Sequence, residues 1–144
     1  MSINKDLLAK KLDFLNQHLS AIERMDFDEQ NFVENDDIHD LIVFRLQQAV
    51  ETAIDIGAHI ITESEFPRKE TAKDIFFFLG EQKIIDKELS SHMGKAADFR
   101  NRVVHSYNNF DYSLLFRDYK DNLKDLHDFG TQIFKFIDSG SSPE

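Results

Sequence analysis

The sequence of 144 residues predicts an all-α protein, folded as an up-and-down helical bundle of about five helices. Glycine and proline are scarce, at 5 and 2 residues. Apolar residues recur every three to four positions over long stretches, and no stretch alternates apolar and polar residues over the length of a strand. We expect a single domain over residues 1–138 and a disordered tail over residues 139–144.

The first expected helix follows Asn4, a suitable N-cap, and continues for about 20 residues because one apolar stripe extends to Ile22. Residues 26–40 contain seven acidic residues and no Lys or Arg, which predicts a solvated connection. Asp36 or Asp37 is expected to cap the second helix. That helix is apolar on more than one face up to Ile61, so it is predicted to be the central, most buried one.

Three further helices are expected. Pro67 marks a break, residues 71–79 form a short apolar helix, and Gly80 supplies its stop. Asp86 opens a fourth helix that reaches Val104, and a fifth follows from Asp111 to Ile137. Fourteen phenylalanines exceed what one such core needs, which indicates that some of this apolar surface is buried against a second subunit.

Composition excludes several functions. The chain has no cysteine, which excludes disulfides and thiolate chemistry, and no apolar stretch approaches the ~20 residues that span a bilayer. The first residues lack a cationic and then apolar leader, so we expect a cytoplasmic protein without a membrane partner. The net charge of −10 argues, on its face, against a polyanionic partner.

Histidines are the first candidates for chemistry near neutral pH. Asp55, His59 and Glu63 fall on one face of the second helix, a pattern that can hold a metal ion but more commonly forms a solvated or intersubunit ion-paired face. His39, like His18 and His127, is expected at the surface. We therefore predict no metal site and no cofactor.

The segment 95–107 combines the groups that cleavage of RNA by its own 2′-hydroxyl requires. His105 can carry a proton, Arg100 can stabilise the charge on the phosphorane, and Asn101 and Tyr107 can orient it. No metal is needed, because the nucleophile belongs to the substrate. The same helix offers Arg102 and Lys95 as contacts to substrate phosphates.

Helix geometry complicates this assignment. At 100° per residue, His105 lies 140° from Arg100, so the two converge only if the helix unwinds or a second subunit completes the site. A two-fold dimer would supply two copies of each residue to one groove. The alternative interpretation is structural, because cations in the last turns stabilise the negative end of any helix.

Residues 100–107, Arg-Asn-Arg-Val-Val-His-Ser-Tyr, match the R-x4-H-x-Y motif of HepT-like HEPN toxins. The resemblance extends over roughly residues 38–135, through the pattern of residues 48–61, Pro67 and Gly80. It implies a HEPN fold that dimerises and cleaves RNA without metal, as the toxin of a type VII toxin–antitoxin pair. It also implies a partner, a minimal nucleotidyltransferase (MNT) antitoxin.

The resemblance assigns roles residue by residue. Arg100 and His105 would be the catalytic pair, Asn101 a supporting polar group, and Tyr107 the residue to which the antitoxin transfers AMP. Such a modification would place a bulky anion near His105, where substrate phosphate must lie. The acidic stretch 26–40 departs from the family pattern, because it is longer and more charged. We interpret it either as a solvated connection or as an antitoxin contact.

Two other functions remain open at this point: a non-catalytic HEPN module that binds a nucleotide or a partner, and a purely structural helical adaptor. Charge does not exclude RNA, because residues 26–40 account for −7 of the total, whereas residues 92–107 carry three Lys/Arg against one Asp. We therefore expect RNA binding that is local and modest.

Overall fold

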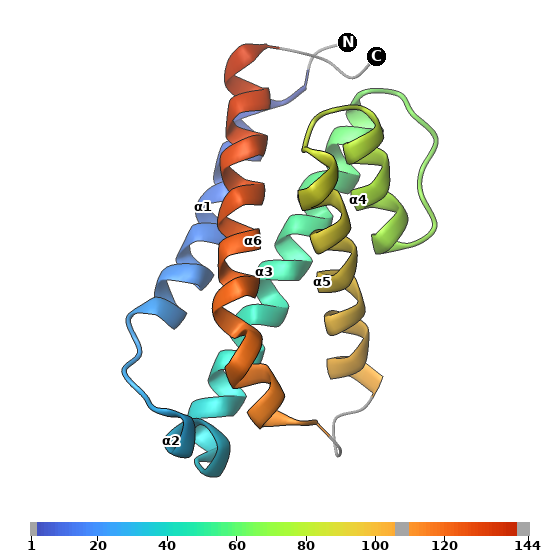
Figure 1. The fold of residues 1–144 in the computed structure, drawn as a ribbon. Helices are drawn as coiled ribbons and strands as arrows, with labels where there is room; N and C mark the ends of the chain where they lie inside the picture. The colour runs from blue at the N-terminus through green and yellow to red at the C-terminus, as the bar shows by residue number, and fades with distance from the viewer. Residues whose placement is uncertain (1–2, 106–109, 141–144) are drawn as a thin grey trace.

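A computed structural model describes residues 3–105 and 110–140, and the side chains of this range except those of residues 104 and 105. This part of the chain contains six α-helices and no strand, which confirms the predicted all-α class (Figure 1). The helices are α1 (Lys5–Glu23), α2 (Glu29–Glu34), α3 (Asp36–Glu63), α4 (Ala72–Glu81), α5 (Lys87–His105) and α6 (Tyr112–Ser139).

The four long helices, α1, α3, α5 and α6, run alternately up and down and form the bundle (Figure 1). Helix α4 packs against α3 and α5 at one end, and α2 packs against α3 and α6 at the other. Helix α3 contacts all five other helices, so the prediction of a central second long helix is confirmed. The C-terminal end of α5 lies at the same end of the bundle as α2.

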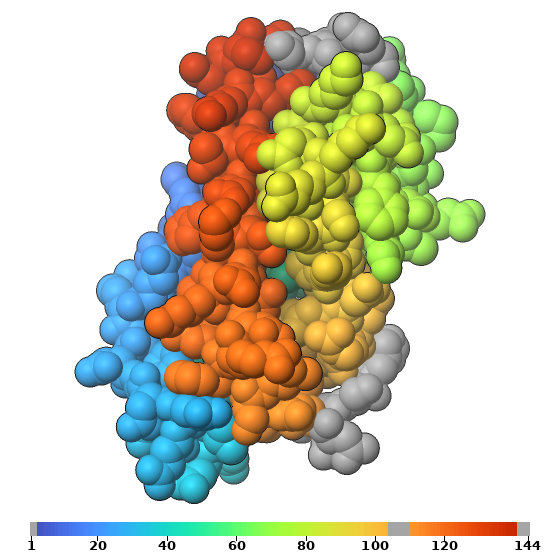
Figure 2. Space-filling view, viewed as in Figure 1, coloured from blue at the N-terminus to red at the C-terminus, as the bar shows by residue number. Residues whose placement is uncertain are grey.

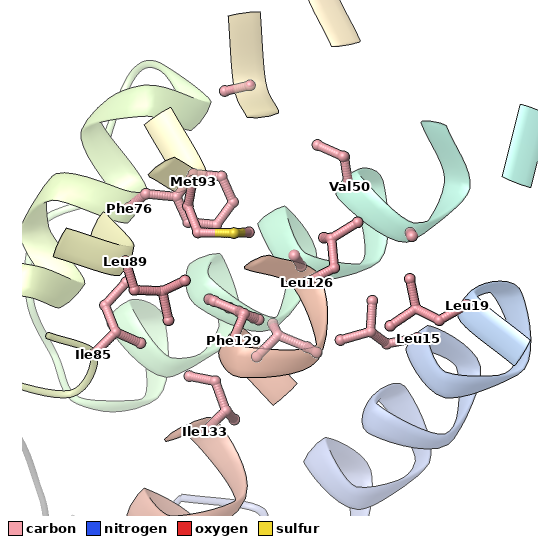
Figure 3. Packing of buried hydrophobic residues seen from close by; sticks show 14 of the residues in the cluster. Leu15, Leu19, Val50, Phe76, Ile85, Leu89, Met93, Leu126, Phe129 and Ile133 are labelled. Atoms are coloured by element: carbon pink, nitrogen blue, oxygen red, sulfur yellow. The ribbon is translucent and has the colours of Figure 1, made fainter. Parts of the chain in front are cut away.

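The buried side chains form one continuous cluster that extends between all these helices. Figure 3 shows its middle, where Phe129 of α6 lies between Leu15 of α1 and the α4–α5 side chains Phe76 and Met93. These four side chains are completely buried. Burial of this apolar surface is the main stabilising contribution to the bundle.

Helix caps follow the sequence in most places. The side chains of Asn4, Asp86 and Asp111 accept backbone N–H hydrogen bonds at the starts of α1, α5 and α6, at 3.0, 2.7 and 3.0 Å. The expected cap at Asp36 or Asp37 is wrong by one residue. Asn35 caps α3 instead, because it has the extended backbone of a cap and accepts from the Asp37 N–H at 2.9 Å.

The acidic stretch 26–40 is more than a solvated connection. It contains α2, whose Phe32 is completely buried among aromatic rings, including those of Phe27, Phe116 and Tyr119. The sequence did not predict this helix, because a single buried aromatic ring among acidic residues gives no periodic pattern over 6 residues.

Gly80 does not end its helix. It lies within α4, where a Cβ would come 2.6 Å from both the Cβ and the Oγ of Ser90 on α5. The residue is therefore needed for the close approach of α4 and α5. The turn that follows has Lys83 with a positive φ of 60°.

His39 is buried, contrary to the expected surface position. Its Nδ1 lies 2.9 Å from the Phe32 carbonyl oxygen, and its ring stacks on Tyr112 at 3.6 Å between centroids. His18 is half-buried beside Arg45, and both burial and this cation lower its pKa. His127 is exposed, as expected.

Helix α6 extends to Ser139 and ends at Gly140, which has a left-handed φ of 71°. The predicted tail therefore begins one residue inside the helix, and residues 141–144 lie outside the described range. No described helix is long and apolar enough to cross a bilayer.

Candidate functional site

Helix α5 carries most of the predicted site residues along its last three turns. Its Asp86 cap fixes the start, and the apolar residues Leu89, Met93, Phe99 and Val103 face the core. Helical spacing then places the intervening polar residues on the flanks of the helix.

Arg100 lies on the flank of α5 that faces α3. Its Nη1 donates a hydrogen bond to Oε1 of Glu51 at 3.0 Å. The Arg100 side chain is 26% exposed, and its Nε is buried with no acceptor in the described part of the protein. The guanidinium is thus anchored at one corner while part of its hydrogen-bonding capacity stays unused.

Lys95 and Arg102 lie on another flank, which faces α6. Both are exposed and line a groove of about 800 Å³ between α5 and α6, whose surfaces adjoin in Figure 2. Positions 100 and 102 are 160° apart around a helix, and positions 95 and 100 are 140° apart. Within one chain, the structure therefore does not bring Arg100 together with Lys95 and Arg102.

The groove between α5 and α6 is acidic. Five aspartates line it against three Lys or Arg side chains and His92. Several of the acids have partners: Lys73 pairs with Asp98 at 3.0 Å, and Nδ1 of His92 lies 3.0 Å from Asp125. A hydrogen bond from Arg117 lowers the pKa of Asp118. The aspartates in this groove are Asp98, Asp111, Asp118, Asp121 and Asp125.

A smaller hollow of about 430 Å³ lies between α3, the end of α5 and the start of α6. It is mainly apolar, and Phe44 at its edge is 50% exposed. Gln47 and Val103, which also line it, stand about one helical turn from Glu51 and Arg100 respectively. The sequence did not predict this hollow.

The remaining predicted residues lie at the end of α5. Asn101 is exposed. His105 is the last residue of α5, but its side chain lies outside the described range, as does Tyr107 entirely. The helix therefore continues without unwinding from Arg100 to His105, which leaves their positions 140° apart around its axis.

The face of α3 with Asp55, His59 and Glu63 forms ion pairs. Lys11 of α1 pairs with Asp55, His59 pairs with Glu63, and Glu63 also accepts a hydrogen bond from the Asn4 N–H at 2.5 Å. Among the residues described, no group of three or more His, Asp or Glu side chains is placed to hold a metal ion.

Glu51 is the site residue that sequence reasoning missed. It stands in the quoted pattern of residues 48–61, but nothing in its spacing connects it to a residue 49 positions later. Only the packing of α3 on α5 reveals the contact. The available signal was its place as an acid among the largely apolar positions of the central helix.

Residues 15–133 match the family described as Ribonuclease HepT-like. The chain is also similar to an mRNA nuclease HepT of Shewanella oneidensis, at 23% identity over 86% of this chain and 93% of the relative. A tRNA nuclease HepT of Aphanizomenon flos-aquae is 30% identical over 77% of this chain and 71% of the relative.

Solved structures have the same fold. A tri-AMPylated Shewanella oneidensis HEPN toxin, in complex with an MNT antitoxin, matches with a TM-score of 0.83 at 23% identity, over 90% of this chain and 98% of that one. A cytosolic protein of unknown function, YutE of Bacillus subtilis, matches with a TM-score of 0.84 at 19% identity, over 100% and 98% of the two chains. The predicted HEPN fold is thereby confirmed.

Proposed function

Because the chain belongs to the ribonuclease HepT-like family, we propose that it is a metal-independent endoribonuclease and the toxin of a HEPN/MNT toxin–antitoxin pair. Membership confirms the resemblance inferred from the motif and, with it, the class of enzyme, a ribonuclease. The proposal adds the chemistry, the residues, the cytoplasmic location and the partners.

The observation that carries this function is the placement of Arg100. It lies on a helix that packs against α3, α4 and α6, five positions before His105, and Glu51 anchors it at a single corner. A cation held in place before substrate binds is what stabilisation of a developing anion requires. Asn101, exposed at the next position, supplies a neutral polar group beside it.

The reaction is an in-line transfer within the RNA. A histidine removes the proton of a 2′-hydroxyl, and the oxygen attacks the adjacent phosphorus. Arg100 stabilises the added negative charge of the phosphorane. The bond to the 5′-oxygen then breaks, and that oxygen takes a proton from a second histidine. The products are a 2′,3′-cyclic phosphate and a 5′-hydroxyl.

Two histidines per reaction favour a composite site in a homodimer. One chain supplies one His105, and it stands 140° from Arg100 on an unbroken helix, so the second chain is needed to complete the set. Exposed apolar side chains next to this face support such an interface: Leu41 is 42% exposed and Phe44 is 50% exposed.

The groove between α5 and α6 has a secondary role, which is to bind RNA phosphates. We assign Lys95 and Arg102 to phosphates of the RNA strand on either side of the cleaved one. Both are exposed, and neither makes an ion pair with another described residue, so their charges are available. The surrounding aspartates keep such binding weak and local.

The proposed regulator is an MNT antitoxin that transfers AMP to Tyr107. The AMPylated Shewanella toxin in complex with such an antitoxin supports this assignment. The added phosphodiester would repel RNA at the composite site. Co-expression with the cognate antitoxin should raise the intact mass by whole AMP units, and Tyr107→Phe should abolish the increase. An unchanged increase in Tyr107→Phe would contradict the assignment.

The test of the nuclease is cleavage of RNA by the purified chain in EDTA. We expect 2′,3′-cyclic phosphate ends, and we expect Arg100→Ala to abolish both cleavage and growth inhibition. Arg117→Ala is the matched control, because Arg117 also pairs with a carboxylate but is exposed on α6. Tight nucleotide binding without cleavage would instead identify the non-catalytic module.

A further inference from the structure

Glu51 occupies a fixed position opposite the motif helix. Its neighbours in α3, Val50 and Ala53, are almost or completely buried, so the backbone beneath Glu51 belongs to the packed core. Its side chain is 40% exposed, and its carboxylate reaches across to α5. No other hydrogen bond of the Arg100 side chain joins it to the described residues.

The form of this contact differs from that of the other Arg–carboxylate pair in the chain's described part. Arg117 uses both Nε and Nη2 to hold the two oxygens of Asp118, at 3.0 and 3.2 Å, so one edge of its guanidinium is filled. Arg100 uses Nη1 alone. Its Nε–H is buried without an acceptor, which is a costly state for a polar group.

An end-on contact of this kind has two effects. It restricts the rotamers of a long side chain, which would otherwise lose that freedom when substrate binds. It also leaves the two N–H groups of Nη2, which is not buried, for another acceptor. A bidentate pair through Nε and Nη2, as in Arg117–Asp118, would restrict the side chain equally but would also occupy Nη2.

We propose that Glu51 is a positioning residue for Arg100: it orients the guanidinium from α3 and leaves Nη2 to donate to the phosphorane. This inference rests on the proposed ribonuclease function. Glu51 itself is an anion beside the site and repels substrate phosphate. Its loss should therefore impair the chemical step without weakening RNA binding, which a purely structural role would not produce.

The experiment measures kcat and KM for RNA cleavage by Glu51→Ala and Glu51→Gln. Asp55→Ala is the matched control, because Asp55 stands one turn along the same helix and pairs with Lys11 across α1 and α3. We expect Glu51→Ala to lower kcat about ten- to a hundredfold with KM unchanged or lower. Glu51→Gln keeps a neutral acceptor and should recover part of the loss. Asp55→Ala should retain kcat.

Each other outcome is decisive. An unchanged kcat in Glu51→Ala, with a melting temperature lowered as in Asp55→Ala, would reduce Glu51 to a structural ion pair. A higher kcat would mean that Glu51 competes with phosphate for Arg100. Either result, with wild type active and Arg100→Ala inactive, refutes the positioning role alone. If Arg100→Ala cleaves as well as wild type, the proposed function fails and the role of Glu51 fails with it.

Discussion

The two flanks of α5 differ in the number and sign of the charged side chains that they carry. Toward α3, one cation, Arg100, meets one carboxylate, Glu51, about one helical turn from residues that line a mainly apolar hollow. Toward α6, Lys95 and Arg102 line a groove that contains five aspartates. The first flank holds one cation in a defined orientation, whereas the second carries many charges of both signs on an exposed surface.

The positive charges of one short segment therefore need not act together. All of them fall within eight residues of the sequence, yet the helix divides them between two flanks. Arg100 is suited to chemistry, because it is anchored and only 26% exposed. Lys95 and Arg102 are suited to weak contacts along a strand, because their charges are exposed and surrounded by acids.

The largest expected effect is at the last residue of α5, His105. His105→Ala should lower cleavage about 10²–10⁴-fold, the usual contribution of general acid–base catalysis. RNA cleavage and growth inhibition would be measured together, with circular dichroism as a check on folding. His127→Ala, an exposed histidine on α6 paired with Glu23, is the control. Equal toxicity of wild type and His105→Ala would remove the catalytic assignment.

The next effect tests whether the flank of α5 that carries Arg100 is completed by a second chain. Phe44→Asp places a charge at the edge of the hollow and should convert the proposed dimer to a monomer, with cleavage reduced about tenfold or more. Sedimentation velocity gives the oligomeric state. Phe14→Asp is the control, because Phe14 is 58% exposed on α1, which does not contact α5. A monomeric Phe44→Asp with full activity would show that one chain suffices.

A smaller effect is expected in the acidic groove. Arg102→Ala should weaken RNA binding several-fold and reduce the salt dependence of binding by about one unit, while kcat is retained. Asp121→Asn in the same groove should strengthen binding, since it removes a repelling charge. Binding would be measured by fluorescence anisotropy over a range of salt concentrations. An unchanged salt dependence in Arg102→Ala would exclude a phosphate contact.

The smallest effect concerns the cap that sets α5 against α6. Asp86 accepts hydrogen bonds from the Leu89 N–H and from Gln132, and these lower its pKa. The Asp86 carboxylate therefore contributes its full stabilisation above the carboxyl pKa of the unfolded chain, about 4. This contribution is lost as pH falls through the lower pKa of Asp86 in the folded protein. Asp86→Ala should lower stability by about 1 kcal/mol at pH 7.

Urea unfolding of Asp86→Ala measures this loss at neutral and acidic pH, with the exposed Asp13→Ala on α1 as the control. The difference from wild type should shrink as wild-type Asp86 becomes protonated. A difference that is the same at pH 7 and pH 3 would show that the carboxylate does not act through its charge.

The sequence predicted the long helices and most of their caps because these depend on local pattern. Asn4, Asp86 and Asp111 cap helices where expected, and the apolar stripes face one core. It missed α2, because Phe32 is buried by residues distant in sequence. It also misread Gly80, whose requirement arises from Ser90 on another helix.

The candidate site shows the same difference between what local pattern predicts and what tertiary packing decides. The motif placed Arg100 on α5, but the orientation of its side chain depends on Glu51, which only tertiary packing brings near. The sequence likewise grouped Lys95 and Arg102 with Arg100, although helical rotation directs them to a different neighbour. Local periodicity predicts helices well, whereas contacts between helices decide which charges meet.

The most direct test of the account compares Arg100→Ala with Arg102→Ala in single-turnover cleavage, at saturating RNA and in EDTA. We expect Arg100→Ala to lower the rate about 10²–10³-fold, because one transition-state donor is lost, while Arg102→Ala cleaves at nearly the wild-type rate. Equal losses in the two variants would contradict the division of labour between the two flanks of α5. An active Arg100→Ala would contradict the catalytic role of Arg100 itself.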